Sequence, residues 1–229
     1  MTRSSRSRVV AEWMQQQIRD GNWPLNTRIP TEAQLAETLA VGRSTIREAT
    51  RALANTGMLE SVAGVGTFVR ARSPVNAVLS EHLVHQPVAA VLGLRRALEV
   101  EAAGLAAARR TEEDLERMRR SLEAGNAAVT DPGPAPALPS PGSFHADMFA
   151  AAGNPLLAEF YQCAMVAIRY AMGSGQLRPG TREDRAHDHR QIFEAIVAAD
   201  PDAARAAAAA HADRDFTPAG VPEPTTTAR

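Results

Sequence analysis

The sequence contains one cysteine, no lysine and few aromatic residues. Because Cys163 is the only cysteine, an internal disulfide bond and a zinc site built from several cysteines are excluded. Aromatic residues make up 4% of the chain, whereas the hydrophobic 45% is dominated by Ala and Leu. This composition favours helices over a β-sandwich, and we therefore expect a mainly α-helical protein.

Long apolar runs are absent as well. No segment is long and apolar enough to predict a transmembrane helix, and the stretch MTRSSRSRVVAEW has basic residues but lacks the apolar core of a signal peptide. We therefore expect a cytoplasmic protein. The 229 residues exceed what one compact domain usually needs, so two domains are expected.

The overall net charge of −1 is unevenly distributed. Residues 1–72 contain ten Arg and six acidic residues, a net charge of +4, whereas the rest of the chain contains fifteen Arg and twenty acidic residues, a net charge of −5. Only the first part therefore has the basic excess that is typical of a nucleic-acid-binding domain. We give the absence of Lys no functional weight.

The first part of the chain predicts three helices. Apolar residues recur at helical steps in RVVAEWMQQQIRDG, which predicts the first helix. Thr31, with Gln34 three residues later, predicts a capping box at the start of a second, short helix. After the tight turn AVG, Ser44 or Thr45 is expected to cap a third helix. Two short helices joined by a turn that contains Gly indicate a helix-turn-helix.

The segments MLESV and TFVR, separated by AGVG, predict a β-hairpin directly after the third helix. A hairpin at this place is typical of a wing, so residues 1–72 are expected to form a winged helix-turn-helix domain. Residues 73–87 mix Pro, Ser, His and Asn without a clear period and are expected to be a linker.

The second domain is expected to be an all-helical bundle over residues 88–216. Its predicted helices cover about 91–110, 112–124, 144–153, 155–168, 183–199 and 201–215. The Pro-rich insert 130–142 has no helical period and is expected to be a loop, and the tail 217–229 is expected to be disordered.

The segment RIPTEAQLAETLAVGRSTIREATRALANTGMLESVAGVGTFV closely resembles the winged helix-turn-helix of the GntR superfamily of bacterial transcription regulators. The P-T-E opening, the R-x-x-x-R-E-A run and the G-x-G-T-F-V wing occur together and in order. In the second domain, LRRALEVEAAGLAAA, FHADMFAAAGNP and HDHRQIFEAIVAADPDAA resemble the FCD ligand domain of the FadR-like branch.

The resemblance implies a third helix whose first turn enters the major groove of DNA. It implies DNA-binding residues in the two short helices and the wing: Thr31, Arg43, Ser44, Thr45, Arg47, Gly64 and Gly66. Arg47 is expected to reach a guanine edge bidentately, and Ser44 and Thr45 suit phosphate contacts. Relatives often carry Arg where this chain has Ala33, so their operator preference does not transfer.

Three histidines match the metal-ligand positions of FCD domains: His145, His189 and His211. Relatives have an Asp four residues before the first of them, where this chain has Pro141. Three neutral imidazoles can still hold Zn, Ni, Cu or Fe, with Asp147 or Asp188 as a possible replacement carboxylate. His187, two residues before His189, is expected to be exposed.

Arg95 shares a helical stripe with Val91 and Leu98, where an unpartnered charge would be costly. Because relatives commonly bind small carboxylic acids in this domain, Arg95 is a candidate for binding the carboxylate of an effector. The alternative is a structural ion pair with Glu99 or another acid. Cys163 and Met165 are expected in the core.

These patterns predict a dimeric, ligand-responsive regulator, most simply a repressor, that binds a palindromic double-stranded DNA operator and senses a small organic acid. It is not expected to be an enzyme. One alternative is a DNA-binding dimer whose helical domain no longer senses a ligand. The other is a three-His metal hydrolase, against which stands the lack of an H-E-x-x-H helix.

Overall fold

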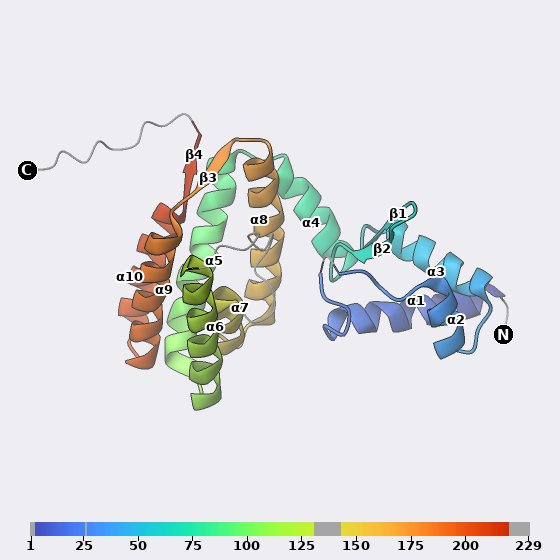
Figure 1. The fold of residues 1–229 in the computed structure, drawn as a ribbon, viewed down its shortest axis with the longest axis horizontal. Coiled ribbons are helices and arrows are strands. Elements are labelled where there is room, and N and C mark those ends of the chain that lie inside the picture. Colours follow the sequence, from blue (N-terminus) through green and yellow to red (C-terminus); the bar gives the residue numbers. More distant parts are fainter. Residues whose placement is uncertain (1–2, 26, 131–142, 220–229) are drawn as a thin grey trace, which may run out of the picture. The chain divides into compact units, whose positions relative to one another are not determined.

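The computed structural model describes residues 3–25, 27–130 and 143–219. The chain divides into two compact units, Met1–Glu81 and His82–Arg229, which Figure 1 colours from blue to green and from green to red. The described residues form ten helices and two small two-stranded sheets, which confirms the expected mainly helical class. None of these helices is long and apolar enough to cross a membrane.

The first unit begins with three helices and a hairpin: α1 (Arg3–Arg19), α2 (Glu32–Thr38), α3 (Arg43–Asn55), β1 (Leu59–Val62) and β2 (Gly66–Val69). Its core is made by the inner faces of α1 and α3, where Met14, Ile18, Ile46 and Leu53 are almost completely buried. Leu35 of α2 packs into the same cluster. The unit is therefore the predicted winged helix-turn-helix.

The predicted capping box at the start of α2 is confirmed. The amide of Gln34 donates to Thr31 Oγ1 at 3.3 Å, and the amide of Thr31 donates to Gln34 Oε1 at 2.9 Å. The predicted cap of α3 is wrong, because this helix already starts at Arg43 with Gly42 as its N-cap, and no side chain caps it. Thr45 consequently lies within the helix, next to Ile46 on its inner face, and is 8% exposed.

The wing is the antiparallel pair β1–β2, with Leu59 opposite Val69 and Val62 opposite Gly66. The chain before α2 lies along its free edge, because the amide of Ile29 donates to the carbonyl of Thr67 at 2.9 Å. This places Arg28 against β2. The hairpin confirms the sequence prediction, whereas nothing in the sequence indicated this third segment.

The segment 73–87 contains a helix, α4 (Pro74–Val84), which the sequence did not predict. Pro74 stands at its first position, where a missing amide hydrogen has no cost, and the amide of Asn76 donates to Ser73 Oγ at 3.2 Å. A cap and a first-turn proline thus start a helix in a stretch that looked like a loop. The boundary between the two units falls within this helix, after Glu81.

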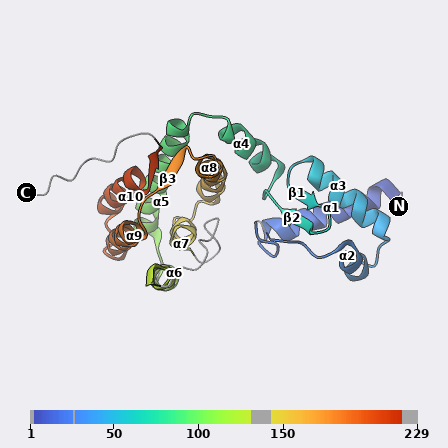
Figure 2. The ribbon, with the colours of Figure 1, turned by 45° about the horizontal axis from the view of Figure 1, so that its top comes forward.

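The second unit contains the six predicted helices: α5 (Val88–Arg109), α6 (Glu112–Thr130), α7 (Phe144–Ala151), α8 (Pro155–Gly173), α9 (Arg182–Val197) and α10 (Pro201–Asp215). Helix α5 is central, with α9 and α10 on one side and α8 on the other (Figure 2). Its contact with α10 is close, because Ala102 and Ala106 of α5 and Ala204 and Ala208 of α10 are small and fully buried.

The remaining expectations for this unit have mixed outcomes. Asn154 caps α8 and Pro155 follows it, as expected, and Cys163 and Met165 lie in the core. Helix α6 runs six residues further than predicted, to Thr130; the rest of the Pro-rich insert, 131–142, lies outside the described residues.

The start of the tail is ordered, which corrects the prediction of disorder from residue 217. Strand β4 (Phe216–Pro218) pairs antiparallel with β3 (Leu177–Pro179), a sheet that was not predicted. Strands of three residues are too short to show a two-residue period, so this pairing has no sequence signal. Residues 220–229 lie outside the described residues.

Candidate DNA interface and histidine cluster

The outward face of α3 carries the arginines of the predicted DNA interface. Arg43, Ser44 and Arg47 are exposed, whereas Thr45 is buried and does not join them. Arg51, one turn beyond Arg47, is exposed as well. Arg51 was not among the predicted contacts, although its spacing of four residues from Arg47 places it on the same face.

Arg47 has a partner in the free protein. Its Nε lies 3.3 and 3.2 Å from the two carboxylate oxygens of Glu32, and its Nη2 donates to Glu32 Oε2 at 3.0 Å. This hydrogen-bonded contact raises the pKa of Arg47 above its usual value. The sequence did not predict the pair, because its members are 15 residues apart in different helices.

The two wing glycines have different surroundings. A Cβ on Gly64 would meet open space, and its φ of +74° explains why Gly is preferred. A Cβ on Gly66 would lie 2.7 Å from Nε of Arg28, so Gly66 is needed for the arginine side chain to lie across the wing. Arg28 is exposed, and its side chain has no ion pair within the described residues. It was not among the predicted contacts.

A cavity of about 170 Å³ lies between the wing and the helix-turn-helix, lined by Arg28, Glu32, Thr50, Gly66 and Thr67 among others. Thr50 Oγ1 is buried without a hydrogen-bond partner among the described residues. The predicted contacts Thr31 and Gly66 also line this cavity, so the structure places them near each other and near Glu32.

The second unit brings the three predicted metal-binding histidines together from three helices. His145 lies on α7, His189 on α9 and His211 on α10, and one potential ligand atom of each lies within 4.8 Å of the other two. Each also has a buried ring nitrogen without a hydrogen-bond partner among the described residues: His145 Nε2, His189 Nε2 and His211 Nδ1. Three such nitrogens in one cluster fit a bound metal ion.

Two of the histidines, His189 and His211, are held in the neutral form that metals bind. Burial, and then the neighbouring His145, lowers the pKa of His211 to about 4 and that of His189 well below its usual value. Phe144 stacks on His189 with ring centroids 4.8 Å apart. By contrast, His187 is exposed, as predicted.

The two acids that were expected to replace the missing Asp, Asp188 and Asp147, differ in their distance from the histidines. Asp188 is buried with Oδ2 3.5 Å from His211 Nδ1, but its other oxygen accepts from Arg214 at 2.5 Å. Among the described residues, Asp147 forms no ion pair with any of the three histidines. Pro141 itself lies outside the described residues.

Glu99 is a third acid, and the sequence did not indicate it as a ligand. It is 1% exposed, and its Oε1 lies 3.2 Å from His145 Nε2. Its Oε2 is buried without a hydrogen-bond partner among the described residues. Although burial opposes ionisation, Arg95 and then His145 hold the pKa of Glu99 well below its usual range.

Arg95 forms the structural ion pair that was its alternative role. It is 1% exposed, its Nε donates to Glu99 Oε1 at 3.0 Å and its Nη2 donates to Asp215 Oδ2 at 2.7 Å. Its third nitrogen, Nη1, is buried without a hydrogen-bond partner among the described residues. One nitrogen of Arg95, with its two N–H groups, therefore remains available to donate to a ligand.

Removal of Arg95 is expected to destabilise the helical unit. An Arg95→Ala change leaves Glu99 and Asp215 buried without their cation, which costs about 3 to 5 kcal/mol of unfolding free energy. Urea unfolding followed by circular dichroism measures this loss. Both tryptophans, Trp13 and Trp23, lie in the first unit, so their fluorescence reports separately on that unit.

The neighbouring residue provides the control for this substitution. Arg96 pairs with Asp213 at 2.9 Å, but both side chains are about half exposed, at 46% and 59%. Arg96→Ala should therefore change stability by less than about 1 kcal/mol. Equal losses from the two variants would contradict a stabilising role of the buried Arg95 network.

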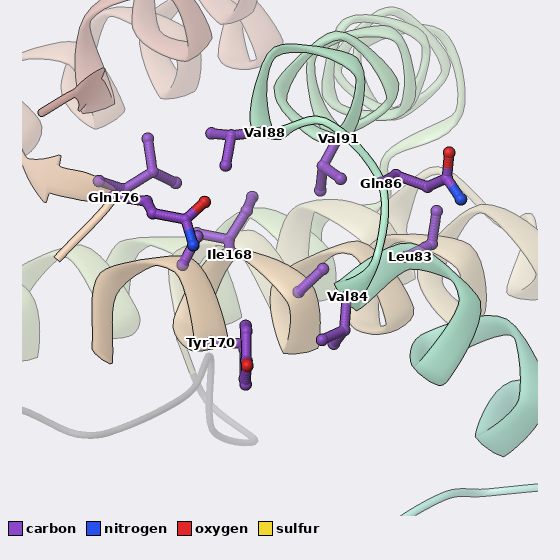
Figure 3. A pocket seen from close by; sticks show the side chains of 11 residues that line it. Leu83, Val84, Gln86, Val88, Val91, Ile168, Tyr170 and Gln176 are labelled. Carbon is purple, nitrogen blue, oxygen red and sulfur yellow. The ribbon is translucent and has the colours of Figure 1, made fainter. Parts of the chain in front are cut away.

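A separate pocket lies where the end of α4 meets α5 and α8 (Figure 3). Leu83, Val84, Val91, Ile168 and Tyr170 are among its lining residues, and its volume of about 20 Å³ holds roughly one water molecule. It is too small for a metabolite.

The first unit is a winged helix-turn-helix whose third helix exposes arginines, and the second is a helical unit with a buried polar cluster. This combination is typical of a DNA-binding transcription regulator that carries a second, ligand-binding domain. Family models identify the group. The model "Bacterial regulatory proteins, gntR family" matches residues 6–69, and the FCD domain model matches residues 90–214. The chain belongs to the gntR family of bacterial regulators that carry an FCD domain, as its motifs predicted.

Named relatives agree with this assignment. The chain is 29% identical over 217 residues to the protein named "Putative L-lactate dehydrogenase operon regulatory protein" of Escherichia coli K12, covering 88% of this chain and 81% of that protein. It is 34% identical over 112 residues to the HTH-type transcriptional regulator LutR of Bacillus subtilis, covering 46% of this chain and 50% of LutR. These proteins are regulators, which speaks against the hydrolase alternative.

The comparison with solved structures gives a further match. The Streptococcus agalactiae GntR structure is 26% identical in sequence, with a TM-score of 0.48, and the alignment covers 90% of this chain and 97% of that one.

Proposed function

We propose that the protein is a repressor that binds a palindromic operator as a dimer and is released from it by a small organic acid. The proposal of DNA binding rests on the exposed row of Arg43, Arg47 and Arg51 on α3. One winged unit reads only a few base pairs, so a useful specificity requires two units on a two-fold symmetric site. Arg43, Ser44, Arg47 and the wing glycines Gly64 and Gly66 are the proposed contacts.

The proposed metal site consists of His145, His189 and His211 with Glu99 as the carboxylate. Two donors of one ion lie about 3.0 to 3.4 Å apart when each bond is about 2.1 Å long. The 3.2 Å between Glu99 Oε1 and His145 Nε2 falls in this range. Glu99 thus supplies the charge that the Asp replaced by Pro141 supplies in relatives, and Zn or Ni suits these ligands.

The proposed effector site combines this metal with Arg95. The charges of the buried acids Glu99, Asp188 and Asp215 are balanced by Arg95, Arg185 and Arg214, which are their ion-pair partners. An added carboxylate would therefore find no excess positive charge unless the metal is present. With the metal bound, the carboxylate can lie beside it and accept a hydrogen bond from Arg95 Nη1.

Operator selection tests this function. Duplexes selected by the protein from a random pool should contain two inverted half-sites, and the protein in solution should have twice the 24.4 kDa mass of one chain. L-lactate is the first effector to test, because the Escherichia coli relative is named for an L-lactate dehydrogenase operon. It should weaken operator binding by the zinc-treated protein and have less effect after chelation.

Other outcomes would contradict separate parts of the proposal. Selection of a single half-site by a monomer would exclude the dimer. Release that is equally strong after chelation would exclude the metal from effector binding. Unchanged binding with L-lactate would exclude this hydroxy acid while leaving the operator result in place.

A further inference from the structure

The ion pair between Arg47 and Glu32 lies on the surface that is proposed to meet DNA. Arg47 is on the exposed face of α3, and Glu32 is the first residue of α2. Both side chains are accessible, at 57% and 39% exposure, so the pair does not belong to the core. A surface ion pair of this kind contributes less than about 1 kcal/mol to folding. Glu32 also stands in the first turn of α2, where an acid is favoured by the helix dipole. Both contributions to stability are small, whereas the acid lies where it repels phosphates.

The geometry of the pair shows which part of Arg47 it occupies. Glu32 accepts hydrogen bonds from Nε and Nη2, which lie on one edge of the guanidinium plane. Nη1 has no hydrogen bond to Glu32. The outer edge, formed by Nη1 and the second hydrogen of Nη2, is therefore left for a base. Arginine reads guanine through two parallel hydrogen bonds to O6 and N7, which requires the guanidinium plane to be fixed.

We propose that Glu32 is a positioning residue for sequence recognition by Arg47. It fixes the plane of the guanidinium before DNA arrives, so less of the roughly 2 kcal/mol of arginine side-chain entropy is lost on binding guanine. Its carboxylate also repels the phosphates of any duplex, which lowers the affinity for operator and for unrelated DNA alike and leaves their ratio unchanged. The increase in the ratio of specific to unspecific affinity therefore comes from the fixed plane of Arg47. The inference depends on the proposed contact of Arg47 with guanine.

The test compares two isosteric changes on the same helix. Glu32→Gln removes the charge that holds Arg47, and Glu37→Gln removes a charge from an exposed residue of α2 whose side chain has no ion pair within the described residues. Affinities are measured for the operator selected by the unmodified protein, for operators with one guanine replaced at a time, and for an unrelated duplex. Thermal unfolding followed by tryptophan fluorescence shows that the first unit is folded in both variants.

Both variants are expected to bind the unrelated duplex more tightly, because each has lost a negative charge. Only Glu32→Gln should lower the ratio of operator affinity to unrelated affinity, by about tenfold. The loss of base preference should be confined to one guanine of the half-site, the same guanine at which Arg47→Ala loses its preference. In an Arg47→Ala background, Glu32→Gln should leave the ratio unchanged.

Three results would overturn the proposal. The first is an unchanged ratio in Glu32→Gln, which would mean that Arg47 leaves Glu32 to bind DNA without help from it. The second is an equal fall in Glu37→Gln, which would assign the effect to net charge. The third is an Arg47→Ala variant whose guanine preference is unaltered, which would mean that Arg47 does not contact guanine. This result would leave the proposed DNA-binding function in place, because the protein would still bind its selected operator.

Discussion

Arg47→Ala is expected to weaken binding to the selected operator by roughly 10- to 100-fold, the largest effect we expect of a single change in the first unit. Two hydrogen bonds from a guanidinium to one guanine contribute about 1 to 3 kcal/mol of discrimination. Arg47 is the arginine whose plane is already fixed, by Glu32, in the free protein. Gel-shift titrations with the operator and with versions altered at each guanine measure the effect.

The pattern of losses matters more than their size. If Arg47 contacts a base, the variant should lose its base preference at one position of each half-site. If Arg47 contacts a phosphate, the variant should bind all sequences more weakly, and the slope of log affinity against log salt concentration should fall by about one. Arg19→Ala is a matched control, because it removes the same charge from α1, where the Arg19 side chain donates a hydrogen bond to Gln16 and forms no ion pair among the described residues. A uniform loss of affinity in Arg47→Ala would reassign Arg47 to the DNA backbone.

His189→Ala is expected to abolish metal binding by the second unit. The purified protein should contain about one Zn or Ni per chain, and the variant close to none, since loss of one of four donors commonly leaves too little affinity to survive dialysis. Metal present at a hundred times its dissociation constant stabilises the native state by about 2.7 kcal/mol. A chelator should therefore lower the melting temperature of the unmodified protein and leave the variant unchanged.

The chain itself offers the control for this experiment. His187 lies two residues before His189 on α9 and is exposed, so His187→Ala should retain the metal. Glu99→Gln should weaken zinc binding measured against a competing chelator, if Glu99 supplies the carboxylate. Metal that is retained by His189→Ala would show that the ion binds elsewhere. If no preparation contains metal, an effector would have to bind to Arg95 without an ion.

The sequence by itself determined most of the elements and their order, with the exception of α4, β3 and β4. Helical periodicity, the capping box of Thr31 and Gln34, and the Asn154-Pro155 start of α8 depend on contacts within a few residues, and all three were correct. The family also followed from the sequence, because its motifs are local and ordered. Predictions failed where the signal was short or ambiguous, as in the three-residue strands β3 and β4 and the helix that begins at Pro74.

The tertiary structure decided how side chains combine. Arg95 meets His211 across 116 residues and Asp215 across 120, and Glu32 meets Arg47 across 15, so no periodicity predicts these partners. Burial of Thr45 likewise depends on where α3 starts. The physical reason is that helix formation depends mainly on neighbours along the chain, whereas a buried charge is stable only where the packing of distant helices brings its partner within hydrogen-bonding distance.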